Sequence, residues 1–323
     1  MKLGLIAAAG LMVAVALALG SGDRGLGRPL LLVEPTMNGD PPGQTPDPAP
    51  GRDACLNPRG WPAVWERMDL FGQAYQFFAA WTDAELSQCF LNLRHAGKRL
   101  VVASGAIKPH CTTAGACWGG VAPVIRRMKA LGAEIAYLEI DEPLTTGGQP
   151  SFDHAVRQTA RFIGFARQEL PGVGIILQEA YPHQDAATLK AFVREVDRGA
   201  EALTGLGIQY VQLDHDWLRG GSGRDIAAIQ DSARSDGVRF GVIFWRADPA
   251  LAWEEALMKQ AALYKGYRRS GVSPDMYAVI NWTGTPEVTV PEWTVEGRQT
   301  FLQAVRRFVM EQVPPVTGDD ATW

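Results

Sequence analysis

The sequence predicts a single-domain α/β protein of the (β/α)8 class, the TIM barrel. Apolar runs of strand length alternate with amphipathic runs of helix length over nearly all of the 323 residues. Eight such units fit into about 280 residues, and this barrel usually takes about 250. A doubly wound open sheet is the alternative, but no glycine-rich phosphate loop follows an early strand.

The first 20 residues predict an export signal. Lys2 gives a positive start, and residues 3–20 are uncharged and end in small side chains. The same run is long enough to remain as an uncleaved membrane anchor. Both readings place the folded part outside the cytoplasm, as a secreted or periplasmic protein.

The next segment, residues 21–60, is rich in Pro and Gly. An apolar run at 30–33 is expected to form the first strand, and the stretch from Pro35 to Pro58 lacks apolar periodicity and should form a loop. The rest of the barrel should occupy residues 61–313, and residues 314–323 should form a tail.

The later elements follow in order from their own local signals. The strands are β-branched or aromatic runs bounded by turn residues. The first long helix opens with a Thr82/Glu85 capping box and closes at Gly97, and Ser151 and Asp185 are expected to cap later helices. Strands are expected at 74–78, 99–104, 134–140, 174–178, 208–213, 239–244 and 276–280. Helices are expected at 82–97, 121–131, 152–170, 186–203, 225–235, 249–269 and 295–312.

Four cysteines suit an oxidising compartment, and they allow three pairings. Cys111 and Cys117 bracket a short Thr/Gly/Ala segment and could staple one loop. Cys55 would then reach Cys89 on the first long helix. We favour this connectivity.

Composition excludes some partners and suggests others. A formal charge of −4 and a pI near 5.8, without long charge runs, disfavour nucleic acid. No CxxC pair occurs and the five histidines are far apart, so no zinc site or other cofactor is predicted. Ten tryptophans exceed what a core of this size usually needs, so some should face a ligand. The expected membrane contact is limited to the N-terminal segment, and the sequence leaves the oligomeric state open.

The run Tyr137-Leu138-Glu139-Ile140-Asp141-Glu142-Pro143 carries the strongest functional signal. It is an apolar strand that ends in two adjacent carboxylates and a proline. Acid/base residues of barrel enzymes lie at the carboxyl ends of the strands. Glu142 is therefore the residue we expect to be catalytic.

The residues expected just after the other strands form a mouth of aromatic and charged groups. Indole faces cover sugar rings, while carboxylates, amides and cations bind hydroxyls, so a carbohydrate substrate is expected. Further catalytic candidates are Glu179, Asp214 and Asp216. Substrate contacts are expected from Glu34, Lys108, His110, Asp141, Tyr181, His183, His215, Trp217, Trp245, Arg246, Asn281 and Trp282.

Asp141-Glu142-Pro143 resembles the Asn-Glu-Pro ending of strand four in a superfamily of barrel glycoside hydrolases. Trp282 in Val279-Ile280-Asn281-Trp282 is similar to the strand-eight tryptophan that lines their sugar subsite. The order Thr-Asp-Ala-Glu-Leu, Asp-Glu-Pro-Leu and a late Pro-Glu also resembles bacterial secreted barrel proteins of unassigned function. The resemblance covers most of residues 30–312 and implies an acid/base role for Glu142.

One departure from that superfamily concerns strand seven. The superfamily has its nucleophilic glutamate there, whereas this chain has Phe244-Trp245-Arg246-Ala247-Asp248. The second carboxylate must then come from Asp214, Asp216 or Glu179. A pair from strands four and six suits the wider gap, about 6.5–9.5 Å, of an inverting enzyme.

The mechanistic hypothesis assigns the proton to Glu142. Its pKa should be raised by Asp141 and by partial burial, so that it protonates the departing oxygen while Asp214 or Asp216 activates water. Two other readings remain open: a carbohydrate-binding barrel without catalysis, and a metal-dependent lyase or isomerase with Glu142, Glu179 and Asp214 as ligands.

Overall fold

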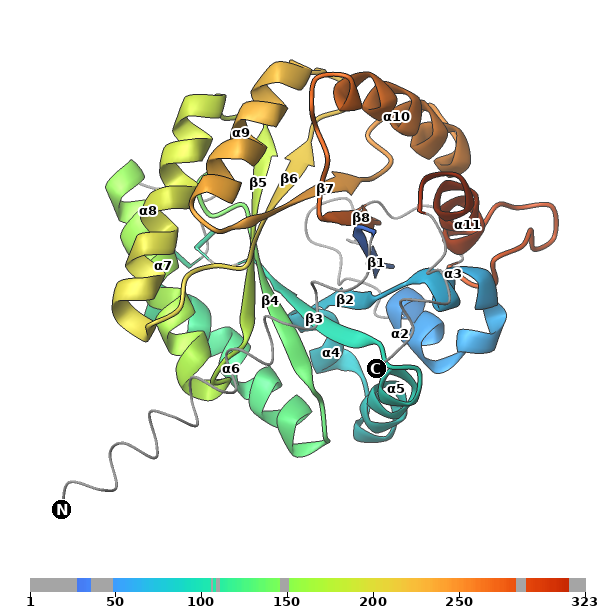
Figure 1. Ribbon diagram of the computed structural model, residues 1–323. Coiled ribbons are helices and arrows are strands. Elements are labelled where there is room, and N and C mark those ends of the chain that lie inside the picture. Colours follow the sequence, from blue (N-terminus) through green and yellow to red (C-terminus); the bar gives the residue numbers. More distant parts are fainter. Residues whose placement is uncertain are drawn as a thin grey trace.

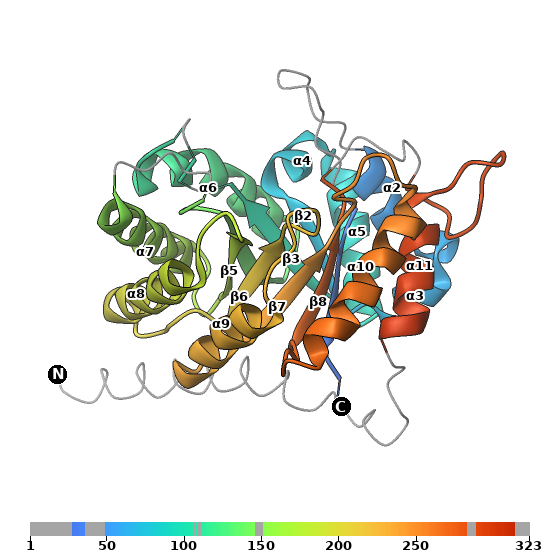
Figure 2. The ribbon, with the colours of Figure 1, turned by 90° about the horizontal axis from the view of Figure 1, so that it is seen from above.

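The computed structural model describes residues 28–35, 49–105, 107–108, 111–145, 151–282 and 289–313. Within these ranges eight parallel strands close into a barrel in sequence order, and β1 pairs with both β2 and β8. The helices form an outer layer around the strands, and a view turned by 90° shows them beside the barrel wall (Figures 1 and 2). The (β/α)8 prediction is therefore confirmed.

The barrel alternates strands with helices along the chain. The strands are β1 (Leu30–Glu34), β2 (Leu70–Ala74), β3 (Arg99–Ser104), β4 (Ile135–Asp141), β5 (Gly174–Tyr181), β6 (Tyr210–His215), β7 (Arg239–Phe244) and β8 (Met276–Ile280). The helices are α2 (Ala49–Leu56), a 3-10 turn (Pro58–Gly60), α3 (Pro62–Arg67), α4 (Tyr75–Ala80), α5 (Asp83–His95), α6 (Ala114–Ala130), α7 (Phe152–Glu169), α8 (Ala186–Thr204), α9 (Gly223–Ser235), α10 (Trp253–Arg268) and α11 (Phe301–Gln312).

Local signals located several elements well. β3, β7 and β8 have the predicted bounds. The capping box of α5 is confirmed, because the Thr82 hydroxyl accepts from the Glu85 N–H at 3.3 Å and the Glu85 carboxylate accepts from the Thr82 N–H at 2.8 Å. Ser151 and Asp185 cap α7 and α8 as expected.

The strand expected at 74–78 is wrong. β2 ends at Ala74, and the aromatic run from Tyr75 to Phe78 belongs to helix α4. The inward positions of β2 include Gly72 and Ala74, which give little hydrophobic signal. The aromatic residues after them therefore dominated the sequence pattern, although they pack outside the barrel wall.

Several expected helix starts are also wrong. α2 lies inside the segment expected to be a loop, α10 starts at Trp253 rather than 249, and α11 starts at Phe301 rather than 295. α6 starts at Ala114, seven residues before the expected position of 121, and contains Pro123. Glycines and a proline weaken a helix pattern, but tertiary packing overrides such local preferences.

Both expected disulfides are present. Cys55 of α2 is bonded to Cys89 of α5, and Cys111 is bonded to Cys117 of α6, with Cα–Cα distances of 5.2 Å in each pair. Residues 1–20, with the expected export signal or anchor, and the tail 314–323 lie outside the described residues. None of the helices described is both long and apolar enough to span a membrane.

The barrel interior is filled by the inward side chains of the strands. The inner cluster includes Leu30 and Leu32 of β1 with Tyr137 of β4, and it is separate from the larger layer between strands and helices. Gly72 faces this space: a Cβ atom added there would lie 2.0 Å from the Glu34 Oε1 atom. The missing side chain of β2 thus makes room for the Glu34 carboxyl group.

We predict that Gly72→Ala destabilises the protein by about 1–3 kcal/mol, because the added methyl group overpacks the barrel interior against Glu34. Urea unfolding of the two proteins measures the difference. The matched control is Gly119→Ala in α6, where an added Cβ meets no atom within 4 Å and should raise stability by up to about 1 kcal/mol. Equal stability of Gly72→Ala and the natural protein would show that Glu34 does not occupy this space.

Candidate functional site

Four carboxyl groups point into the barrel because side chains alternate along each strand. On β1 the inward series Leu30 and Leu32 continues to Glu34, and on β4 Tyr137 is followed by Glu139 and Asp141. On β6, Tyr210 is followed at steps of two by Gln212 and Asp214. Acids from three strands therefore meet at the carboxyl end of the barrel.

Glu34 and Glu139 form a buried carboxyl pair. Both side chains are 0% exposed, they share a hydrogen bond, and no N–H donor among the described residues reaches either group. Burial raises the pKa of Glu34 to about 8, aided by the charge of Asp141, and burial with the charge of Glu34 raises the pKa of Glu139 well above its ordinary value. The hydrogen bond requires a proton on one of the two groups.

Glu142 and Asp214 form a second carboxyl pair, nearer the opening. Their side chains share a hydrogen bond, and burial, followed by the charges of Glu142 and Asp141, raises the pKa of Asp214 well above its ordinary value. Glu142 itself is half-buried and has φ 44°, and its N–H bonds to the Gln178 carbonyl oxygen at 3.0 Å. The structure thus brings together the acids predicted on strands four and six.

Asp141 differs in its surroundings from the two carboxyl pairs, Glu34–Glu139 and Glu142–Asp214. The Lys108 ammonium lies 3.0 Å from its Oδ2 atom, and the Gln178 side-chain amide donates to its Oδ1 atom at 3.0 Å. Its side chain is 26% exposed. Asp141 is therefore a partly solvated carboxylate with a cation beside it.

Glu179 does not join the mouth group. It lies on the outward series of β5, and its carboxylate accepts from the backbone N–H groups of Leu144 and Thr145, at 2.7 and 3.1 Å, and from the Thr145 hydroxyl. Burial raises its pKa to about 8, although these hydrogen bonds act in the opposite direction. Glu179 holds the turn after Glu142.

Asp216 anchors the loop after β6. Its Oδ1 atom accepts from the backbone N–H groups of Leu218 and Arg219 at 3.0 Å each. Its Oδ2 atom lies 3.3 Å from the Arg219 side chain and 3.4 Å from His183. These contacts give Asp216 and His183 a role in stabilising the loop after β6.

Three expected sugar contacts, His215, Tyr181 and Trp217, lie in the layer between strands and helices. His215 is fully buried, stacks on Tyr181 and contacts the Tyr267 hydroxyl at 3.1 Å; burial lowers its pKa to about 4. Trp217 donates from its indole nitrogen to the Ile243 carbonyl oxygen at 3.1 Å and stacks on Phe244. This position gives them a packing role.

The remaining expected contacts follow β7 and β8. Trp245 and Trp282 pack on the inner cluster and are partly exposed at the mouth. Arg246 is partly buried, while Asn281 is fully buried and its N–H bonds to the Glu34 carbonyl oxygen at 3.0 Å. The expected contact His110 lies outside the described residues.

The acids do not gather as metal ligands within the described ranges, where no group of three His, Cys, Asp or Glu side chains is arranged to hold an ion. The three ligands of the metal-dependent hypothesis are separated, since Glu179 turns to Leu144 and Thr145 while Glu142 and Asp214 pair with each other. Sequence reasoning missed Gln178 and Gln212, whose buried amides border the acids. The alternation of side chains along β6, in which Tyr210 and Asp214 face inward, also predicts that Gln212 faces inward.

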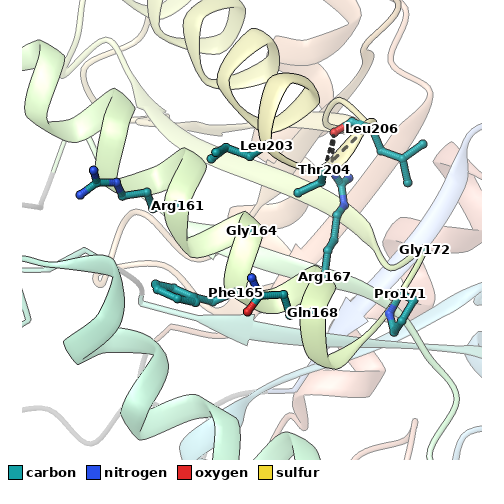
Figure 3. A pocket seen from close by; sticks show the side chains of 10 residues that line it. All are labelled: Arg161, Gly164, Phe165, Arg167, Gln168, Pro171, Gly172, Leu203, Thr204 and Leu206. Carbon is teal, nitrogen blue, oxygen red and sulfur yellow. Dashed lines mark hydrogen bonds between the residues drawn. The ribbon is translucent and has the colours of Figure 1, made fainter.

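A groove of about 580 Å³ lies at the other end of the barrel, between the last turns of α7 and α8 (Figure 3). Pro171 and Gly172, which precede β5, form part of its wall. Arg167 crosses it to the Thr204 hydroxyl at 2.8 Å and the Leu206 carbonyl oxygen (Figure 3). The buried Arg167 side chain therefore connects α7 to the end of α8. The carboxyl pairs lie at the opposite end of the barrel.

No protein-family model and no curated protein matches the chain. Solved structures resemble it weakly. A xylanase from Thermoanaerobacterium saccharolyticum has a TM-score of 0.48 and 11% identity over 84% of this chain and 90% of that one. D-psicose 3-epimerase from Clostridium cellulolyticum H10 has 0.47 and 12% over 87% and 96%, and the aldolase QR15 has 0.45 and 9% over 78% and 88%. The chain is a barrel protein with a carboxyl-rich mouth, and these similarities carry no activity over to it.

We predict that stability falls as pH rises from about 4.5 to 8, because the folded protein keeps a proton on Glu34 that the unfolded chain has lost in this window. Glu34→Gln, which needs no such proton, should be more stable than the natural protein at pH 8.5 by on the order of 2 kcal/mol. Urea unfolding at several pH values measures this. Glu134→Gln, at an exposed position, is the control. An unchanged pH slope in Glu34→Gln would show that Glu34 is ionised in the fold.

Proposed function

We propose that this protein is a carbohydrate-active enzyme that cleaves glycosidic bonds, with Glu142 as the proton donor. The observation that supports this most is the contact of Glu142 with Asp214 at the carboxyl end of the barrel. Two carboxyl groups in hydrogen-bond contact cannot both be ionised without a large electrostatic cost, so the pair retains a proton near neutral pH. A retained proton is what a general acid must supply.

The surroundings of the pair suit a sugar. Trp245 and Trp282 are partly exposed residues that lie just after β7 and β8 and pack on the inner cluster. Indole faces pack on the C–H faces of sugar rings. Asp141 and Lys108, both partly exposed, add a carboxylate and an ammonium group to the mouth.

The expected wide gap between the strand-four and strand-six acids is wrong for Glu142 and Asp214. An inverting pair leaves room for a water between its carboxyl groups, about 6.5–9.5 Å apart, whereas these two share a hydrogen bond. We therefore assign Asp214 the role of holding the proton with Glu142. Asp216 is held by the loop after β6, which leaves Asp214 as the strand-six acid in the mouth.

A carbohydrate-binding protein without catalysis is the second candidate. The observation in its favour is the position of Trp245. It directly follows β7, where the superfamily that the sequence resembles has its nucleophilic glutamate. Such a protein would bind sugars through the same mouth and release no product.

We predict that Glu142→Gln lowers kcat about 10²–10⁴-fold on whichever glycan the natural protein cleaves, because the amide cannot donate a proton to the leaving oxygen. A screen of polysaccharides and oligosaccharides for released reducing ends identifies that glycan. Calorimetry should show that the variant still binds it. The exposed Glu201→Gln is the matched control.

Full turnover by Glu142→Gln would exclude Glu142 as the proton donor. Binding of a glycan by the natural protein, with no product from any member of the screen, would favour the second candidate.

A further inference from the structure

We infer that Asp141 is the nucleophile of the proposed reaction and that Lys108 is the residue that positions it. This inference rests on the proposed function and supplies the second carboxylate that strand seven lacks. Asp141 is the last residue of β4, and its side chain faces the mouth. The side chain is 26% exposed, so a ligand in the mouth can reach it. Lys108 and Gln178 each contact one of its carboxylate oxygens at 3.0 Å.

The mouth divides its acids into two kinds. Glu142 and Asp214 share a proton, whereas Asp141 has an ammonium and an amide beside it, and the ion pair requires the carboxylate anion. Glycosidases use this division: one carboxyl group in an environment that keeps its proton, and one in a polar, partly solvated environment that stays ionised. Asp141 is the acid of the mouth with the second kind of environment.

The strand register places only short side chains of β5 between Asp141 and Asp214. Asp141 is paired with Gln178 of β5, and Asp214 is paired with Ala180 two residues further along the same strand. Between the two acids, β5 therefore presents to the interior one amide and one methyl group. β5 therefore places no bulky inward side chain beside either acid.

Lys108 is fixed by the disulfide loop. The Ile107 N–H contacts the Cys117 Sγ atom at 3.3 Å, and the Cys111 N–H bonds to the Lys108 carbonyl oxygen at 2.9 Å. The Cys111–Cys117 bond ties this loop to α6. These contacts hold the Lys108 backbone, and its ammonium lies 3.0 Å from the Asp141 carboxylate.

The proposed reaction is a double displacement at the anomeric carbon of the sugar. An Asp141 oxygen forms a bond to the anomeric carbon as the glycosidic C–O bond breaks, and the electron pair of that bond goes to the leaving oxygen. The Glu142–Asp214 pair gives its proton to the same oxygen. Water then attacks the anomeric carbon, releases Asp141 and returns a proton to the pair.

The decisive variant is Asp141→Asn, whose kcat on the cleaved glycan should fall at least 10³-fold. Added azide should restore turnover and yield a glycosyl azide, because it replaces the missing nucleophile. Asp248→Asn is a matched control, since Asp248 is 28% exposed and lies 3.9 Å from the Lys259 ammonium, and it should keep the natural rate. Activity of Asp141→Asn within threefold of this control overturns the inference and leaves the role of Glu142 intact.

Lys108 is tested separately. Lys108→Met should lower kcat about 10-fold or more with little change in KM, and Lys108→Arg should recover part of the loss, because arginine restores the cation beside Asp141. A loss confined to KM would mean that Lys108 binds substrate and does not position Asp141.

Infrared spectra test the charge assignment without a substrate. At pH 6.5, Asp141→Asn should keep the protonated-carboxyl absorbance of the natural protein, and Asp214→Asn should lower it. Loss of that absorbance in Asp141→Asn overturns the inference even if no glycan is cleaved. Failure of the whole glycan screen ends the proposed function, while these spectra still decide whether Asp141 is the anion of the mouth.

Discussion

Closure of the barrel by the pairing of β1 with β8 is the constraint on which the site depends. Five register pairs, from Leu30 with Met276 to Glu34 with Ile280, join the first strand to the last. This pairing turns the Glu34 side chain into an enclosed space that already receives Glu139 and Asp214. Acids brought into a shared interior lose their separate hydration, and they reduce the cost of burial by keeping protons and sharing hydrogen bonds.

The site therefore combines groups that do not favour folding at alkaline pH. Two carboxyl pairs in the interior bind protons that the unfolded chain would release, and the fold must offset that cost elsewhere, through the apolar layer between strands and helices. Among the inward acids that the structure describes, Asp141 is the one with an ion pair, and its partner Lys108 lies three residues before Cys111 of the Cys111–Cys117 disulfide. Buried acids of this kind lower the stability of the fold, whereas the same acids on the surface would cost little.

The sequence was sufficient to predict the barrel and to place Glu142, Asp214 and Asp141 at its mouth, but it also placed Glu179, Tyr181 and His215 there, and these three face the outer layer. The physical reason is the length of β5 and β6. β5 runs to Tyr181, three residues past its expected end, and β6 runs to His215. Glu179 and His215, expected after the strands, are therefore inside them, where every second side chain faces the helices. Glu139 and Glu34 could be placed inward by period, but their contact required closure of the ring, which no local pattern encodes.

The backbone conformation of Glu142 depends on Glu179, the acid on the outward face of β5. Glu142 has a φ of 44°, a left-handed conformation that costs a non-glycine residue about 1–3 kcal/mol, and that is maintained only where the surroundings fix it. Glu179 supplies that fixation, because its carboxylate holds the N–H groups of Leu144 and Thr145 in the turn that follows. A glycine at position 142 would relieve the strain but remove the carboxyl group. The strained conformation turns the Glu142 carboxyl toward Asp214, so the outward acid of β5 supports the inward pair without entering the mouth.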